Sequence, residues 1–162
     1  MELEIDASPS GYGGVLIIQG KVVSYFAEAI SNDDLLALNL TVGDPKGQAV
    51  LEFLALLIGV RLWREQIAVQ KWTATVRSDS TAALGAAAKL RSPDPRMNRI
   101  ARELALDLAE AKYELDFLEH LPGKENIMAD ALSRLEQPEG TAVIPSELKS
   151  VTRAWPCRRG AS

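Results

Sequence analysis

Residues 3–26 read LEIDASPSGYGGVLIIQGKVVSYF, and they predict how the fold begins. Apolar and acidic side chains alternate over residues 3–7, which is the period of a strand with one buried face. Residues 8–11 are turn formers, and two further apolar runs, 15–18 and 21–26, are separated only by Gln19 and Gly20. We therefore expect three antiparallel strands at the start of the chain.

The remainder of the chain alternates between helix and strand patterns. Residues 28–47 show no clear periodicity and are predicted to form an irregular connection. Residues 48–63 are apolar on nearly every side, which predicts a buried helix. The further elements are predicted as strands at 73–77 and 114–121 and as helices at 81–89, 96–112 and 126–135. This order predicts an α/β fold with a mixed five-stranded sheet, three antiparallel strands first, flanked by helices.

Length and composition fit one domain. The 162 residues are 47% apolar, enough to bury a core without disulfides or a structural metal. We expect a domain over residues 1–136 and a flexible tail over 137–162, where Pro, Gly, Glu and Ser dominate. With one Cys and one His, the chain cannot form an internal disulfide or a Cys/His zinc site.

The N-terminal MELEID lacks the basic segment of a signal peptide, and no apolar run is long enough to span a membrane. We therefore expect an intracellular protein that is not secreted and has no membrane partner.

The net charge of −4 is unevenly distributed along the chain. Residues 77–102 carry six basic and two acidic side chains, whereas residues 103–147 carry three basic and eleven acidic side chains. Two interpretations of the basic segment stay open: solvated helix faces, or a surface that contacts phosphates. The acidic total predicts that any affinity for nucleic acid is modest and sensitive to salt.

Four carboxylates recur at the ends of the predicted elements. Asp6 closes the first strand, Asp79 follows the fourth, and Asp130 lies in the last helix. Ligands of open α/β sheets gather at the carboxyl ends of strands. Glu52 is the only charge in the apolar stretch 49–60, and a buried carboxylate needs a partner, for which a divalent cation is the natural choice.

Each of these residues also has an ordinary structural interpretation. Asp79 precedes a helix and could be its N-cap, and Asp130 could be charge placed near a helix N-terminus. Asp6 could form a turn, and Glu52 could lie on a narrow exposed stripe. Individually the four signals are weak, and together they favour a cluster that binds a metal.

The local sequences resemble one family. Residues 6–8 (DAS) and 11–16 (GYGGVL) resemble the opening strand and hairpin of ribonuclease H domains. Residues 52–57 (EFLALL) are similar to that family's first helix, and residues 78–80 (SDS) to its fourth-strand motif. Residues 120–134 (HLPGKENIMADALSR) resemble the closing motif of the ribonuclease H domain in gypsy-type LTR retrotransposon reverse transcriptases. The resemblance covers residues 3–136, and it implies the ribonuclease H-like fold.

The resemblance also implies an activity. It predicts an endoribonuclease that hydrolyses the RNA strand of RNA/DNA hybrids and leaves 5′-phosphate and 3′-hydroxyl ends. Asp6, Glu52, Asp79 and Asp130 would bind two Mg²⁺ or Mn²⁺ ions, since hard cations prefer oxygen ligands. The RNA strand would be selected through 2′-hydroxyls and minor-groove shape. The residues predicted to bind substrate are Ser8, Gly11, Ser80, Asn126 and Arg134.

The same resemblance implies a setting. In the native polyprotein a reverse transcriptase polymerase domain would be attached, and the protein would lie in the cytoplasm or within retroelement particles. One departure concerns the mobile-loop His that many ribonucleases H carry before the last helix. Lys124 stands where that His is expected, and His120 lies earlier, at the end of the last strand, where a structural role is the simpler interpretation.

Other functions fit the sequence less well. A proofreading exonuclease is expected to show Asp-x-Glu on the first strand, and an integrase ends in a Glu helix. A catalytically silent ribonuclease H-like module, which connects or binds other parts of a retroelement polyprotein, is the main alternative. Loss of a carboxylate would favour that module, whereas all four are present here, which favours the enzyme.

Overall fold

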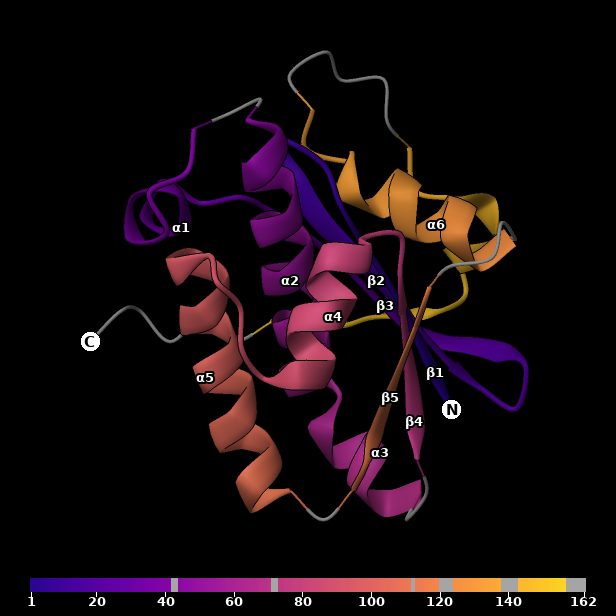
Figure 1. Cartoon of the computed structure of the whole chain (residues 1–162). Coiled ribbons are helices and arrows are strands. Elements are labelled where there is room, and N and C mark those ends of the chain that lie inside the picture. The colour runs from indigo at the N-terminus through magenta and orange to yellow at the C-terminus, as the bar shows by residue number, and fades with distance from the viewer. Residues whose placement is uncertain (42–43, 71–72, 112, 120–123, 138–142, 157–162) are drawn as a thin grey trace.

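A mixed six-stranded sheet with helices on both faces forms the protein (Figure 1). The computed structural model describes residues 1–41, 44–70, 73–111, 113–119, 124–137 and 143–156. The strands follow one another across the sheet in the order β5-β4-β1-β2-β3-β6. Their bounds are β1 (Glu2–Ala7), β2 (Gly11–Ile18), β3 (Lys21–Ala29), β4 (Ala74–Ser78), β5 (Leu115–Glu119) and β6 (Thr152–Arg153).

The three strands predicted at the start are confirmed. β1 pairs antiparallel with β2, and β2 pairs antiparallel with β3 through a turn in which Gly20 has a φ of +75°. β4 runs parallel to β1 and β5 runs parallel to β4. The carboxyl ends of β1 and β4 therefore meet at one edge of the sheet, where the sequence places Asp6 and Asp79.

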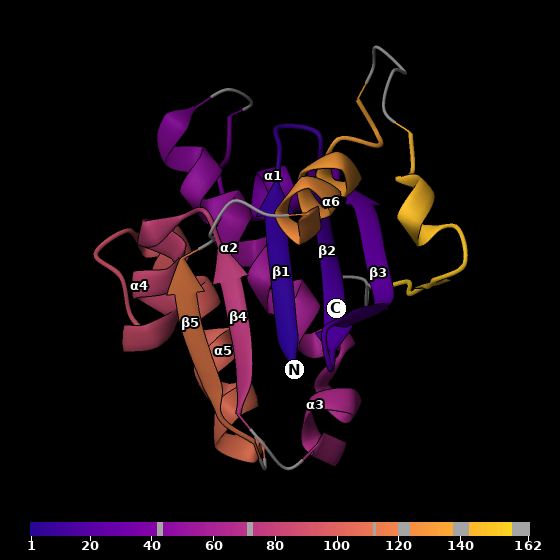
Figure 2. The same cartoon turned by 90° about the vertical axis from the view of Figure 1, so that its right-hand side faces the viewer.

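Two layers of helices cover the sheet. Figure 2 shows α6 in front of β1 and β2, with α2, α4 and α5 behind the strands. No described helix is long and apolar enough to cross a membrane. The helices are α1 (Asn32–Ala37), α2 (Pro45–Leu62), α3 (Arg64–Gln70), α4 (Thr81–Lys89), α5 (Pro95–Glu110) and α6 (Lys124–Ser133), with a 3₁₀ turn η1 (Ser146–Leu148).

The irregular connection predicted over residues 28–47 is wrong. The segment holds the end of β3, the helix α1 and the first residues of α2. Ser31 caps α1 by accepting a hydrogen bond from the Asp34 amide, and Asp44 caps α2 in the same way for Lys46. Polar residues that look like loop composition are thus N-caps, and Pro45 starts α2 at the position where helices tolerate proline.

The sheet has six strands, one more than predicted. β6 pairs parallel with β3, and Leu148 just before it is buried against β2, β3 and α6. Two residues are too few to produce a period-2 pattern, so the sequence gives no strand signal there. Part of the segment predicted as a flexible tail therefore lies against the sheet.

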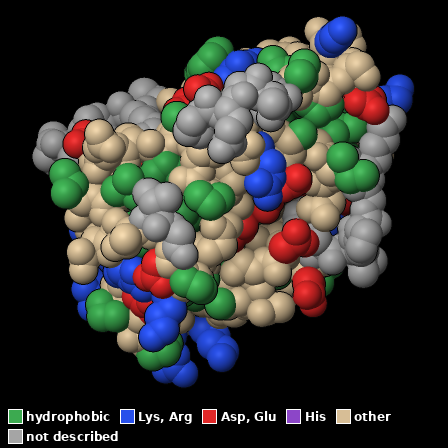
Figure 3. Space-filling view, turned by 90° about the horizontal axis from the view of Figure 1, so that it is seen from above, with side chains coloured by type: hydrophobic (Ala, Val, Ile, Leu, Met, Phe, Trp, Pro, Cys, Tyr) green, Lys and Arg blue, Asp and Glu red, His purple; other side chains and the backbone are tan. Residues whose placement is uncertain are grey.

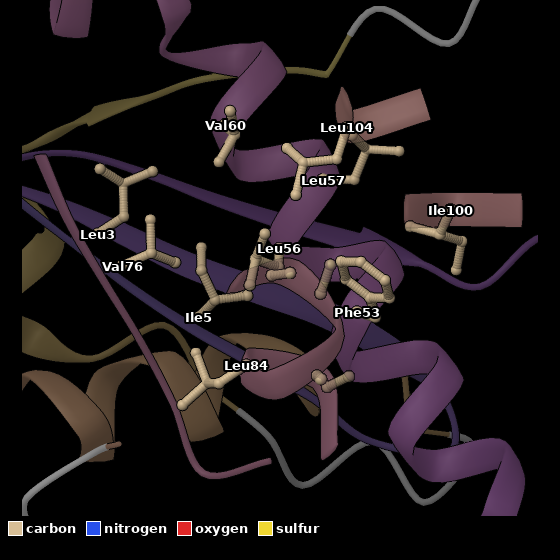
Figure 4. Close-up of a cluster of buried hydrophobic side chains, with 14 of the residues drawn as sticks. Leu3, Ile5, Phe53, Leu56, Leu57, Val60, Val76, Leu84, Ile100 and Leu104 are labelled. Carbon is tan, nitrogen blue, oxygen red and sulfur yellow. The ribbon is translucent and has the colours of Figure 1, made fainter. Parts of the chain in front are cut away.

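The main core lies between the sheet and α2, α4 and α5. Figure 4 shows Ile5 of β1 beside Leu56 and Phe53 of α2, with Leu84 of α4 nearby. All four are buried. Because α2 is enclosed by β1, α4 and α5, it buries residues on most sides, which confirms the helix predicted from its uniform apolarity. Glu52, in the middle of α2, is therefore held inside the protein.

Candidate functional site

Glu52 is held by groups from three elements. Its Oε1 accepts hydrogen bonds from the Ala7 amide of β1 at 3.1 Å and from Gln48 Nε2 of α2 at 3.2 Å. Its Oε2 accepts a hydrogen bond from Ser78 Oγ of β4 at 3.4 Å. Only 5% of the residue is exposed. The exposed-stripe interpretation of Glu52 is therefore wrong, and the expected burial is confirmed.

Asp6 lies between Glu52 and α6. It is 7% exposed, and its side chain shares hydrogen bonds with those of Glu52 and Asp130. Ser133 Oγ lies 3.5 Å from Asp6 Oδ2 and donates to the Asp130 carbonyl at 2.7 Å. The negative charge of Asp79 also acts on Asp6. Asp6 therefore interacts with each of the other three predicted carboxylates.

The pKa values of the two buried carboxyls reflect this crowding. Burial, followed by the charge and hydrogen bond of Asp6, raises the pKa of Glu52 to about 9. Burial also raises the pKa of Asp6 to about 6, helped by Asp130 and Asp79 and opposed by the hydrogen bond to Glu52. At neutral pH the pair therefore retains a proton, on Glu52, because two adjacent buried carboxylates repel each other.

Asp79 and Asp130 form the open side of this group. Asp79 is exposed just after β4, and the side chain of Asp130 is about half exposed. The N-cap of α4 is Ser80, whose Oγ accepts a hydrogen bond from the Ala83 amide, so Asp79 is not needed as a cap. Figure 3 shows acidic side chains gathered near the middle of this face, seen from above. Two buried and two accessible carboxylates thus share one end of the sheet.

The donor set fits a hard divalent cation. As positioned, no group of three or more Asp, Glu, His or Cys side chains in the described ranges forms a ready metal-binding set. The donors are nevertheless all carboxylate oxygens, the type that Mg²⁺ and Mn²⁺ prefer. The proton retained by Asp6 and Glu52 neutralises one of their two negative charges, and a bound cation would neutralise the same charge. A cation in place of that proton suits the chemistry of these residues.

The residues predicted to contact substrate occupy different environments. Ser8 is buried, and its Oγ donates to the Ser133 carbonyl at 2.6 Å. Gly11 lies close to the same carbonyl, since a Cβ added to Gly11 would be 2.8 Å from the Ser133 carbonyl oxygen. Ser80 caps α4. These three positions fix α6 and α4 in place, and their contact with a substrate stays a prediction.

The two predicted substrate residues on and after α6 lie near Asp130. Asn126 is partly buried, and within the described part of the chain its side-chain oxygen has no hydrogen-bond partner. Arg134 Nε pairs with Asp130 Oδ1 at 3.0 Å, one helical turn away. His120 and the side chain of Lys124 lie outside the part of the chain that the structure describes.

Three site residues were missed from the sequence: Gln48, Ser78 and Ser133. Each donates a hydrogen bond toward a predicted carboxylate. Gln48 precedes Glu52 by four residues, the spacing of neighbours on one helix face, so its contact could have been found. The contacts of Ser78 with Glu52 and of Ser133 with Asp6 join residues far apart in the chain, and no local pattern indicates them.

The basic segment 77–102 does not form one surface. Arg77 lies on β4 and is 3.6 Å from both Glu2 and Glu4 of β1. Arg99, on α5, donates to the Ala37 carbonyl of α1 at 2.8 Å. Figure 3 shows Lys and Arg side chains at one corner of the face that carries the acidic group. The exposed basic residues of α4, α5 and their connection are Lys89, Arg91, Arg99 and Arg102.

Comparison with known proteins identifies the fold. No family model and no curated protein matches the sequence. Among solved structures, the chain is similar to LC11-RNase H1 isolated from compost (TM-score 0.61, 18% identity, covering 85% of this chain and 95% of that one). It is similar to RNase H1 from Halobacterium salinarum (TM-score 0.58, 17% identity, covering 85% of this chain and 97% of that one). It also resembles an N-terminal RNase H domain from Mycobacterium tuberculosis (TM-score 0.56, 17% identity, covering 82% of this chain and 95% of that one). The predicted ribonuclease H fold is therefore confirmed.

Proposed function

We propose that this protein is an endoribonuclease that hydrolyses the RNA strand of RNA/DNA hybrids. The observation that carries the proposal is the meeting of Asp6, Glu52, Asp79 and Asp130 at one end of the sheet, two of them buried with raised pKa values. The three solved structures compared above are ribonucleases H by name. A purely structural role does not explain why Asp6 and Glu52 are buried side by side, because burying two adjacent carboxylates costs stability.

The four carboxylates would hold two Mg²⁺ or Mn²⁺ ions. Such ions, when bound, neutralise charge on the phosphodiester and lower the pKa of water. Gln48, Ser78 and the Ala7 amide orient Glu52, and Ser133 orients Asp6. Asp6 and Glu52 must release their shared proton before they can bind a cation, so binding weakens as the pH falls.

The overall reaction is a hydrolysis of the bond between phosphorus and O3′. Water adds its oxygen to phosphorus, the bond to O3′ breaks, and O3′ leaves with a proton. The products are a 5′-phosphate and a 3′-hydroxyl. Asp79 and Asp130 are the accessible members of the group, so the scissile phosphate would approach from their side.

Selection of the RNA strand would come from contacts to 2′-hydroxyls in the minor groove. The turn at residues 8–11 and the start of α4 flank the carboxylates and are suited to these contacts. The exposed Lys and Arg residues of α4 and α5 would contact phosphates, and a net charge of −4 keeps that affinity modest. An attached reverse transcriptase polymerase domain, which the sequence of residues 120–134 favours, would add the missing positive surface.

The test compares the protein with its Asp79→Asn variant on a hybrid whose RNA strand is labelled, in the presence of Mg²⁺. We expect cleavage by the unmodified protein and a fall of about 100-fold or more in the variant, because one charged oxygen ligand becomes a neutral amide. Asp116→Asn is the matched control, since Asp116 is exposed on β5, three residues before the strand ends. Equal cleavage by the protein and Asp79→Asn contradicts the proposal, and cleavage by neither favours a silent connection module.

A further inference from the structure

Gln48 forms a closed set of hydrogen bonds with Glu52 and Ala7. Its Nε2 donates to the Ala7 carbonyl at 2.7 Å and to Glu52 Oε1 at 3.2 Å. The Ala7 amide donates to the same Oε1 at 3.1 Å. Gln48 therefore fixes the Ala7 carbonyl and one oxygen of Glu52, and that same oxygen fixes the Ala7 amide, directly beside Asp6.

The geometry favours an amide at this position. The two N–H bonds of a glutamine Nε2 point in different directions, so each can serve one acceptor. A carboxylate at position 48 could donate to neither, and a lysine would bring a charge into contact with Glu52. With two donors on Oε1 and Ser78 Oγ on Oε2, the carboxyl group of Glu52 has a single supported orientation.

The surroundings show that Gln48 is not needed to fill the core. It is partly exposed, and it borders a cavity of about 120 Å³ between α1, the start of α2 and the turn after β1. The cavity is lined largely by Pro9, Leu35, Leu40, Pro45 and Leu51. A methionine at position 48 therefore has room, and it removes both donors while keeping a similar length.

We infer that Gln48 is a positioning residue for the site: it holds the Glu52 carboxylate and the end of β1 in the arrangement that binds the divalent cations. This inference rests on the proposed function, because it assigns Gln48 a task in that site. Groups that orient metal ligands affect metal affinity or activity by about 10- to 100-fold, although they do not touch the metal. A residue that merely joined α2 to β1 would affect stability and leave metal affinity unchanged.

The test measures Mn²⁺ binding by calorimetry and hybrid cleavage for the full chain and its Gln48→Met variant. We expect the dissociation constant of Mn²⁺ to rise about 10-fold or more and kcat to fall by a similar factor. KM for the hybrid should change by less than about 3-fold, because Gln48 acts on Glu52 and not on the substrate. Gln66→Met is the control, since Gln66 is exposed on α3, and it should change none of these values.

The outcomes separate this inference from the proposed function. A lower melting temperature with unchanged Mn²⁺ affinity and kcat would show that Gln48 is only a structural link and would overturn the inference. If the unmodified protein binds Mn²⁺ without cleaving the hybrid, the proposed function fails while the Mn²⁺ comparison still decides the role of Gln48. If it binds no Mn²⁺, both fail. Should Gln48→Met not fold, Gln48→Asn provides the same comparison, since it keeps the amide but shortens its reach by one methylene.

Discussion

Replacing Gly13 with alanine tests how closely α6 must approach the sheet. Gly13 lies on β2 opposite Asp6, beneath the last turn of α6. An added Cβ would lie 2.5 Å from the Ser133 nitrogen, 2.6 Å from the Ala129 carbonyl oxygen and 2.7 Å from Leu132 Cβ. Because the first two atoms belong to the helix backbone, no side-chain rotation can relieve the overlap.

The helix must therefore move by about 1 Å to restore ordinary contact distances of about 3.5 Å. Overpacking of this kind costs about 1–3 kcal/mol of unfolding free energy. The displaced helix carries Asp130 and Ser133, and a shift of about 1 Å at a catalytic group lowers the rate about 100-fold. We expect the Gly13→Ala variant to unfold at lower urea concentration and to cleave an RNA/DNA hybrid at least 10-fold more slowly.

Gly85 supplies the matched control. It lies within α4, and apart from the backbone of its own helix no atom of the described residues is within 4 Å of an added Cβ. Gly85→Ala should raise the unfolding free energy by about 0.5–1 kcal/mol, since alanine is the better helix former, and should leave cleavage unchanged. Urea unfolding followed by circular dichroism and initial cleavage rates give both quantities. A Gly13→Ala variant as stable and active as the unmodified protein would show that the site does not depend on close packing of α6 against β2.

Two further predictions concern the pH dependence and the C-terminal segment. Folded Asp6 and Glu52 hold protons that the unfolded chain releases near their ordinary pKa values of 3.8 and 4.5. The folded state therefore binds more protons, so without metal the unfolding free energy falls as pH rises from about 4 to 9. Urea midpoints in EDTA should show a smaller fall for Glu52→Gln, and identical slopes would contradict the assignment. Leu148→Ala should cost about 2–4 kcal/mol because the residue is buried against β2, β3 and α6, whereas Val143→Ala, at 76% exposure, should cost almost nothing. Equal effects in urea unfolding would show that the C-terminal segment does not pack as described.

The sequence predicts the first strand from its alternating side chains and α2 from its uniform apolarity, whereas the seven-residue helix α3 was not predicted. The segment over residues 28–47 fails because its helix α1 has six residues, none of them buried, and so lacks an apolar face. What marks this helix is its cap at Ser31, a local hydrogen bond that composition does not distinguish from a loop. β6 escapes prediction for a related reason, because its pairing with β3 depends on contacts distant in sequence.

The candidate site shows the same division. Glu52 could be identified as buried from its apolar neighbours alone, and the nearness of Asp6 and Asp79 follows from the ends of β1 and β4 meeting at one edge of the sheet. The hydrogen bonds from Ser78 to Glu52 and from Ser133 toward Asp6 could not, since they link β4 to α2 and α6 to β1. Such contacts exist only once the fold has formed, and the polar residues that make them are common everywhere in proteins.

Cleavage of RNA paired with DNA at the four carboxylates can be followed on both strands of a hybrid at once. A hybrid with different labels on its RNA and DNA strands is incubated with the protein and Mg²⁺, and the ends of the products are analysed. We predict internal cuts in the RNA strand only, with 5′-phosphate and 3′-hydroxyl ends, and no cutting when EDTA replaces Mg²⁺. Intact RNA, equal cutting of both strands, or cleavage that persists in EDTA would contradict it.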